Sequence, residues 1–455
     1  MCPEYHFARR SLREAADSSN RTATHRDRDR VLYSEAFRRL GGVTQVALGN
    51  PTMALHNRLT HSLKVEQVGV SLYTHLLSLG GDSSQLDQYA IAAACLAHDI
   101  GHPPFGHAGE QELDALVVCA THQKAPVRTS EVRLDDPCKD CKLEDGFEGN
   151  AQSLRIISLL AVHRDSAKGA YGLDMTRASV AATIKYPWLR GHTGKKPTKW
   201  GAYDCDKEIL EWAVGSQNEP SLNAQVMDWA DDISYAVHDI EDFFRAGLIP
   251  LDDYKRVTKT AEDFLEYVES PEALRPLPTE TKKALDQLYV HFPSARFTGD
   301  TEGLAALDRL RGILLGQFIS SAAVVDGDLK PDPSQKQINA VLKQLIWYHI
   351  IHEPKLAAIQ VGQRRVLREI FENLETLAMD AYKIGGGSDH PDPHNLRRLP
   401  HGLRRALEVS VTQDSTYRRP QRIYRGILDY IAGLSDSEAY HLHSVLKGRE
   451  YVGHL

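Results

Sequence analysis

The chain has 455 residues, 42% of them hydrophobic and 25% charged, which is enough to bury a large core. Its mild net charge of −7 does not favour general nucleic-acid binding. No apolar run approaches the ~18 residues that span a bilayer, and the first residues lack the apolar core of a signal peptide. Six cysteines make a poor disulfide framework. We therefore expect a cytoplasmic protein that makes no contact with a membrane.

Apolar residues recur mostly at helical spacing, and alternating strand patterns are scarce. The clearest case runs through Ile233, Val237, Ile240 and Phe244. The sequence therefore predicts a predominantly all-α fold, in which Gly- and Pro-rich segments mark loops. Further helices are predicted over 342–351, 363–382 and 423–434, and loops over 187–204, 324–335 and 385–395.

Two histidines fall on the apolar stripes of two different predicted helices. His61 lies four residues before Val65, and His98 extends the stripe of Ile91 and Ala94. A single such histidine is more often a hydrogen-bonded core residue. Two of them, one followed directly by Asp99, favour a divalent-cation site, which needs imidazoles and carboxylates converging from several directions.

The sequence predicts a turn in the segment that follows His98 and Asp99. The sequence continues as IGHPPFGHAGE (100–110), whose glycines and prolines end the helix and leave the site open on one side. A further carboxylate ligand is expected from MDWADDISYAVHDIEDFF (227–244). There Asp231, Tyr235 and Asp239 form a polar stripe at i, i+4 and i+8. A solvated acidic face remains the alternative, and we prefer it for Glu241 and Asp242.

These segments together resemble the H…HD…D signature of the HD superfamily of metal-dependent phosphohydrolases. Within it the resemblance is much closer to the dGTPase-like deoxynucleoside triphosphate triphosphohydrolases. The signature segments are NRLTHS (57–62), AHDIGHPPFGH (97–107) and DWADDISY (228–235). Supporting segments occur in the family's order at 26–46, 146–156, 183–188 and 429–436. Such a series is far more specific than the HD pattern alone.

The resemblance implies roles for individual residues. The implied metal ligands are His61, His98, Asp99 and Asp231; Asp231 is preferred over Asp232 because only it sets Tyr235 and Asp239 at the family's spacing. His107 matches a catalytic histidine and Glu110 the carboxylate that orients it, with His102 in a secondary catalytic role. The implied substrate contacts are Gln45 at the sugar, Arg58, Lys185 and Tyr186 at the phosphates, and Tyr235 and Asp239 at the 3′-hydroxyl.

The implied activity is hydrolysis of deoxynucleoside triphosphates to deoxynucleoside and inorganic triphosphate. One divalent metal is expected, and two histidines with two aspartates suit Mn, Mg, Fe, Co or Zn. The resemblance also implies a homo-oligomer and leaves open a regulatory dNTP or single-stranded nucleic acid. The alternatives are another HD phosphohydrolase, acting on a nucleotide monophosphate, a cyclic dinucleotide or an alarmone, and a nucleotide or single-stranded-DNA sensor without turnover.

The expected organisation has three parts. Residues 1–30 form an N-terminal segment that we expect to be mobile, residues 31–250 form the helical HD core, and residues 251–455 add C-terminal helices packed on the core rather than an independent domain.

One further motif lies outside the HD signature. Cys119-x2-His122 and Cys138-x2-Cys141 have the ligand count and paired spacing of a structural zinc site. They fall between the FGHAGE and FEGN segments, in a run that is longer than in many members of the family. The alternative is that all four are incidental loop residues.

Overall fold

The computed structural model is predominantly helical, as predicted, and its described residues form one small hairpin of strands. It describes the chain apart from residues 1–6, 12–19, 46–55, 82–83, 125–137, 164–170, 193–195, 197, 216–218, 257, 271–280, 352, 384–390 and 450–455. Within the described residues, no helix is both long and apolar enough to cross a membrane.

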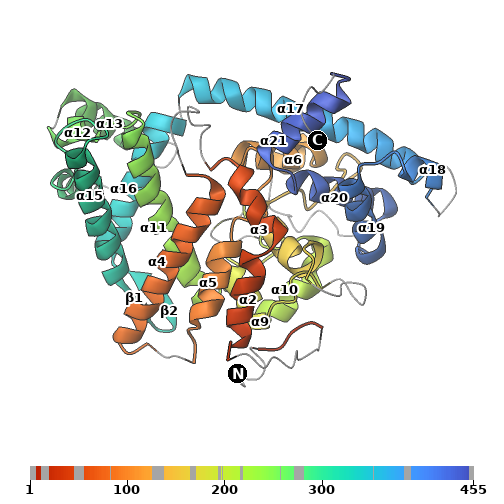
Figure 1. Cartoon of the computed structure of the whole chain (residues 1–455), viewed down its shortest axis with the longest axis horizontal. Helices are drawn as coiled ribbons and strands as arrows, with labels where there is room; N and C mark the ends of the chain where they lie inside the picture. Colours follow the sequence, from red (N-terminus) through yellow and green to blue (C-terminus); the bar gives the residue numbers. More distant parts are fainter. Residues whose placement is uncertain are drawn as a thin grey trace.

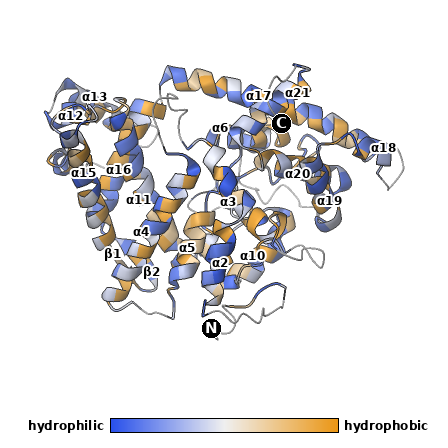
Figure 2. Cartoon of the chain, in the orientation of Figure 1, coloured by the Kyte–Doolittle hydropathy of each residue, from blue (hydrophilic) through white to orange (hydrophobic). Residues whose placement is uncertain are grey.

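Helix α5 (Gln88–Ala97) lies at the centre, and every residue from Ala90 to Ala97 is buried. It contacts α2 (Ala23–Leu32), α4 (Arg58–Ser78), α9 (Arg177–Thr183) and α11 (Leu222–Arg245) (Figure 1). Figure 2 shows the contrast between the largely hydrophobic α5 and the hydrophilic α2. Close packing of α4 on α5 requires Gly69, because a Cβ there would lie 2.6 Å from the Cys95 sulfur.

Polar caps start each helix that carries a predicted metal ligand. Asn57 accepts a hydrogen bond from the Thr60 N–H at the start of α4, Asp87 accepts from the first turn of α5, and Ser221 accepts from Ala224 in α11. Such caps satisfy N–H groups that have no partner within the helix. They therefore set where His61, His98 and Asp231 fall along their helices.

A second group of elements packs against α4 and α11, and shares their core (Figure 1). It comprises α12 (Leu251–Lys255), α13 (Lys259–Glu269), α14 (Thr281–Tyr289), α15 (Thr301–Ser320), β1 (Ala322–Val325), β2 (Asp328–Pro331), α16 (Pro333–Ile346) and the π-helix η5 (Trp347–Ile351). The antiparallel strands replace part of the loop predicted over 324–335. Asp326 and Gly327, both at positive φ, make their two-residue turn.

A third group gathers around the long helix α17 (Pro354–Ala381), which packs on α6 (His107–Val117), α20 (Arg419–Ala432) and α21 (Asp436–Leu446). Helix α18 (Pro393–Leu396) and α19 (His401–Gln413) complete it. The remaining elements are α3 (Glu35–Arg39), η1 (Leu40–Gly42), α7 (Ala120–Lys124), α8 (Gly149–Arg155), η2 (Ile156–Leu160), η4 (Asp204–Asp206) and α10 (Lys207–Val214).

Buried charges join the last helices to the centre. Arg155, at the end of α8, is fully buried and bonds to Asp206, Asp414 and Asp429 at 2.8–3.1 Å. Asp429 lies in α20 and Asp414 directly follows α19. One arginine thus holds together segments that are up to 274 residues apart.

Candidate metal centre and active site

Three predicted metal ligands lie within reach of one ion. The side chains of His61, His98 and Asp99 each offer an atom, and these atoms all lie within 4.8 Å of one another. Asp231 completes the group, because its Oδ1 lies 3.0 Å from His61 Nε2 and 3.4 Å from His98 Nε2. The four ligands come from α4, the end of α5, and α11, so they approach from different directions.

The two imidazoles both turn Nε2 toward this centre, where His61 Nε2 lies 3.0 Å from Asp231 Oδ1. His98 Nδ1–H donates to the Cys95 carbonyl at 2.7 Å, so Nε2 is the nitrogen that faces the centre. That Nε2 is buried and, among the described residues, has no hydrogen-bond partner. Burial also lowers the pKa of His61, despite Asp231 beside it. Two imidazoles and two carboxylates make a donor set that fits a divalent cation.

In each carboxylate of the centre, one oxygen faces the ligand cluster and the other binds a basic side chain. Asp99 turns Oδ1 toward His98 and His102, while Arg58 Nη1 binds its Oδ2 at 2.5 Å. Asp231 turns Oδ1 toward the histidines, and Lys185 binds its Oδ2. Burial alone would raise the pKa of both carboxyls. The charges of His98 and Arg58 outweigh burial at Asp99 and hold its pKa well below the usual range. Lys185 and His98 do the same for the pKa of Asp231. Both groups are therefore ionised and able to bind metal.

The turn after Asp99 reverses the chain and starts α6 beside the centre. Phe105 and Gly106 both have positive φ, at 66° and 58°. Gly106 is required there, because a Cβ would come within 2.9 Å of Arg58 Nη2. The Phe105 N–H donates to Asp436 at 2.8 Å, which holds the turn against α21.

His107 and Glu110, the two residues expected to form a catalytic pair, lie on the first turn of α6. His107 Nδ1 lies 3.0 Å from Glu110 Oε2, and the His107 side chain is 68% exposed. Glu110 is buried, and its Oε1 accepts from the Gly149 N–H at 3.0 Å and from Lys199 Nζ at 3.1 Å. An exposed imidazole held by a buried carboxylate has the arrangement of a general acid or base.

His102 lies between this pair and the metal ligands. Its Nδ1 is 3.1 Å from Asp99 Oδ1, and its ring meets the His107 ring edge-on at 5.3 Å. Burial, with the Arg58 charge nearby, lowers the pKa of His102 to about 4. His102 is therefore neutral near pH 7.

The predicted sugar-contacting residues lie on and near α11. Asp239 is buried, and burial with the negative charge of Asp242 raises its pKa well above the usual range. Asp239 Oδ2 and Gln45 Oε1 are buried acceptors without a hydrogen-bond partner among the described residues. Tyr235 is half-buried against the main core. Tyr186, which was predicted to contact the phosphates, accepts a hydrogen bond from Lys196 at 3.4 Å.

The structure adds neighbours that sequence reasoning missed. Lys199 bridges Glu110 and Glu148, yet it lies in a loop whose sequence has no periodicity to reveal it. His238 is buried beside Asp239, and burial with the charge of Lys64 lowers its pKa to about 2. Its position seven residues after Asp231, two helical turns along the same face, was a usable signal.

A cavity of about 660 Å³ opens beside Lys185, next to the ligand cluster. Its walls include none of the four predicted metal ligands. Charges in its lining balance, because Lys185 and three further lysines face four acidic groups. The charged residues are Lys185, Lys330, Lys336, Lys343, Glu219, Asp228, Asp232 and Asp328. Because the charges of its lining balance, they do not indicate that this cavity binds an anion.

The fold and the ligand cluster define an HD-domain protein, and the HD domain family matches residues 58–236. A deoxyguanosinetriphosphate triphosphohydrolase-like protein of Streptomyces coelicolor is 34% identical, with 94% of this chain and 93% of that protein covered. A protein of the same description from Corynebacterium efficiens is 33% identical over 77% of this chain and 79% of that protein. The chain belongs to this dGTPase-like family of HD phosphohydrolases.

Among solved structures, a phosphohydrolase of Bacteroides thetaiotaomicron matches 90% of this chain and 66% of its own, at 16% identity and a TM-score of 0.39.

Proposed function

We propose that this protein hydrolyses deoxynucleoside triphosphates to deoxynucleoside and inorganic triphosphate. In this reaction water attacks the α-phosphorus, and the 5′-oxygen leaves with the nucleoside. The observation that carries the proposal is the convergence of His61, His98, Asp99 and Asp231 beside the His107–Glu110 pair. The names of the relatives support the choice of a nucleoside triphosphate as substrate.

The four converging ligands would hold a divalent cation, which supplies Lewis acidity at the α-phosphate when bound. Arg58 binds Oδ2 of Asp99, and Lys185 binds Oδ2 of Asp231. At these positions their positive charge offsets the negative charge of a triphosphate. His107 transfers a proton to or from the reacting oxygens, and Glu110 keeps its imidazole oriented.

Buried acceptors support recognition of a sugar hydroxyl. Asp239 Oδ2 and Gln45 Oε1 lack hydrogen-bond partners among the described residues. A buried acceptor without a hydrogen bond lowers stability by about 1–3 kcal/mol. A 3′-hydroxyl can donate to Asp239, whose raised pKa is compatible with a hydrogen-bonding rather than a charge-pairing role. Tyr235 then occupies the space that a 2′-hydroxyl would need.

Replacing Tyr235 by alanine is expected to reduce the preference for dNTPs over NTPs about 10-fold or more, because packing discrimination at one group is worth about 1–3 kcal/mol. The measurement is kcat/KM for dGTP and GTP with wild type and variant. Tyr235→Phe is the matched control, since it keeps the ring and should keep the preference. An unchanged dNTP/NTP ratio in Tyr235→Ala would remove Tyr235 from sugar selection.

Replacing Glu110 by glutamine is expected to lower kcat about 10²-fold with little change in KM, because the charge that orients His107 is lost while the acceptor for Gly149 N–H remains. Glu112→Gln on the same helix is the control. Its carboxylate pairs with Arg368, on α17, away from His107. Equal kcat values for the two variants would refute the pairing role.

The proposed reaction is tested by its products. Purified protein with Mn²⁺ or Mg²⁺ is incubated with each dNTP, and the products are separated by ion exchange. Inorganic triphosphate and deoxynucleoside in equal amounts are expected. Orthophosphate or pyrophosphate would instead indicate another HD phosphohydrolase, and binding without turnover would indicate a sensor.

A further inference from the structure

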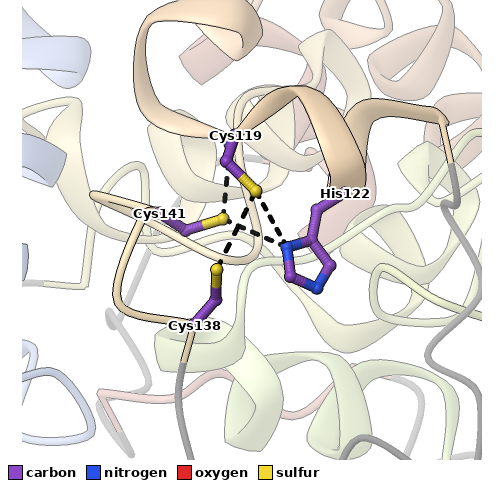
Figure 3. A group of neighbouring side chains, drawn as sticks. All are labelled: Cys119, His122, Cys138 and Cys141. Atoms are coloured by element: carbon purple, nitrogen blue, oxygen red, sulfur yellow. Dashed lines mark hydrogen bonds between the residues drawn. The ribbon is translucent and has the colours of Figure 1, made fainter.

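A second cluster of metal-binding side chains lies at the far end of α6, away from the HD ligands. Three cysteines and one histidine converge there, and their ligand atoms lie within 4.8 Å of one another (Figure 3). Cys119 lies two residues after the end of α6, and His122 lies in α7. Cys138 and Cys141 come from the other side of residues 125–137, which are outside the described part of the chain.

The spacing of these atoms matches that of ligands around one tetrahedral ion. With Zn–S bonds of about 2.3 Å, tetrahedral geometry places sulfurs about 3.8 Å apart. Cys119 Sγ and Cys138 Sγ are 3.8 Å apart. His122 Nδ1 lies 3.1 Å from Cys119 Sγ and 3.4 Å from Cys141 Sγ, a few tenths below the about 3.6 Å of an ideal sulfur–nitrogen edge. The Cys119–Cys138 separation also excludes a disulfide there, which requires about 2.0 Å.

We propose that Cys119, His122, Cys138 and Cys141 bind a structural zinc ion. Three thiolates and one imidazole are the soft and borderline donors that Zn²⁺ prefers. All four tetrahedral positions are filled by protein groups, which is typical of a structural site rather than a catalytic one. The proposal does not depend on the activity of the HD centre.

The zinc site lies at one end of residues 138–149, which run back along α6 toward the active site. Next to the cluster, the N–H groups of Lys142 and Leu143 both donate to the Val117 carbonyl, at 2.8 and 3.1 Å. One turn further back, the Phe147 N–H donates to Asp114 at 3.0 Å. At the near end the Gly149 N–H donates to Glu110 at 3.0 Å.

Apolar contacts follow the same path. Leu143 and Phe147 are buried in one cluster with Leu113 and Val117 of α6, and with Phe371 of α17. Lys142 pairs with Glu375 at 2.7 Å, which adds a second link to α17. We call residues 138–149, which run back along α6, the strap. A zinc ion bound by the four residues would therefore tie the strap to the end of α6. Glu110, which contacts His107, lies on α6 where the Gly149 N–H of the strap reaches it.

Zinc content distinguishes this proposal directly. Wild-type protein is treated with a chelator that strips the HD centre, then analysed by native mass spectrometry and elemental analysis. One retained zinc per chain is expected. The double variant Cys138→Ser/Cys141→Ser should retain none, whereas Cys205→Ser, a free cysteine outside the cluster, should retain one. Asp231→Asn should also retain one, because it affects only the HD centre. Wild-type protein without retained zinc would overturn the proposal.

Stability gives a second readout in the wild-type chain. Removing the zinc with a stronger thiol-directed chelator should lower the midpoint of thermal unfolding by about 5 °C or more, and adding zinc back should restore it. Replacement by Co²⁺ should produce sulfur-to-cobalt charge-transfer absorption, which Cys205→Ser keeps and the double variant lacks. A protein whose mass is lower by two hydrogens, with no metal, would instead indicate a disulfide and refute the zinc site.

Discussion

Asparagine in place of Asp231 is expected to lower phosphohydrolase turnover about 10³-fold or more and to remove metal from the HD centre. Asp231 Oδ1 lies against both imidazoles, at 3.0 Å from His61 Nε2 and 3.4 Å from His98 Nε2. A neutral amide binds a divalent cation more weakly than a carboxylate. It also removes one of the two carboxylate charges that Lys185 contacts among the described residues, leaving only Asp228 at 3.4 Å. The loss follows because metal chemistry at the phosphate is worth several kcal/mol of barrier.

Asp232→Asn is the matched control for that experiment. Asp232 is the next residue of α11, but its carboxylate pairs with Lys343 of α16 rather than with the histidines. This variant should bind metal and turn over as the wild type does. The measurements are turnover with each dNTP and metal content of the purified proteins. Wild-type metal content in Asp231→Asn, or equal losses in both variants, would contradict the assignment of Asp231 as a ligand.

The second large effect is expected on stability. Replacing Arg155 by methionine should lower the free energy of unfolding by about 3–5 kcal/mol, because it leaves buried carboxylates without their cation. Arg155 is fully buried and binds Asp206, Asp414 and Asp429, which are no more than 2% exposed. Denaturant unfolding measures the change. Arg365→Met, which removes the pair between a mostly exposed arginine and Glu369, is the control and should cost at most about 1 kcal/mol.

The stability loss in Arg155→Met should depend on pH. Burial raises the pKa of Asp206 to about 6, although Arg155 opposes the rise. An acid whose pKa is raised by folding contributes stability at low pH, and this contribution is lost as pH rises through the folded pKa. Without Arg155 that pKa should rise further. The variant should therefore be less impaired at about pH 5 than at about pH 8. An equal loss at both values would show that Arg155 does not act through these carboxylates.

Much of the architecture could be predicted because helices leave local signals. Apolar spacing on α11 and α17 and the buried run of α5 follow from periodicity and composition alone. The hairpin β1–β2 was missed, since its strands have only four residues each and offer almost no alternation. The Asp326–Gly327 pair was the remaining signal of that turn.

His61 and His98 could be singled out because they fall on apolar stripes, where a polar residue needs a reason. The full set with Asp99 and Asp231 followed instead from the resemblance to the HD family. Lys199 could not be found in the same way. It reaches Glu110 across 89 residues from a loop, and no local pattern encodes a contact of that kind. The same holds for Arg155, whose partners lie in two distant helical regions.

The sequence by itself determined the class of fold and predicted the order and kind of the candidate ligands. It also named both Cys/His pairs. Only the tertiary structure decided which oxygen of Asp99 and Asp231 faces the imidazoles, and that Arg58 and Lys185 take the other one. It alone brought Cys119 and Cys138 to 3.8 Å. The reason is physical: helix period and capping act over a few residues, whereas such contacts depend on how distant helices pack and on the rotamers that the packing allows.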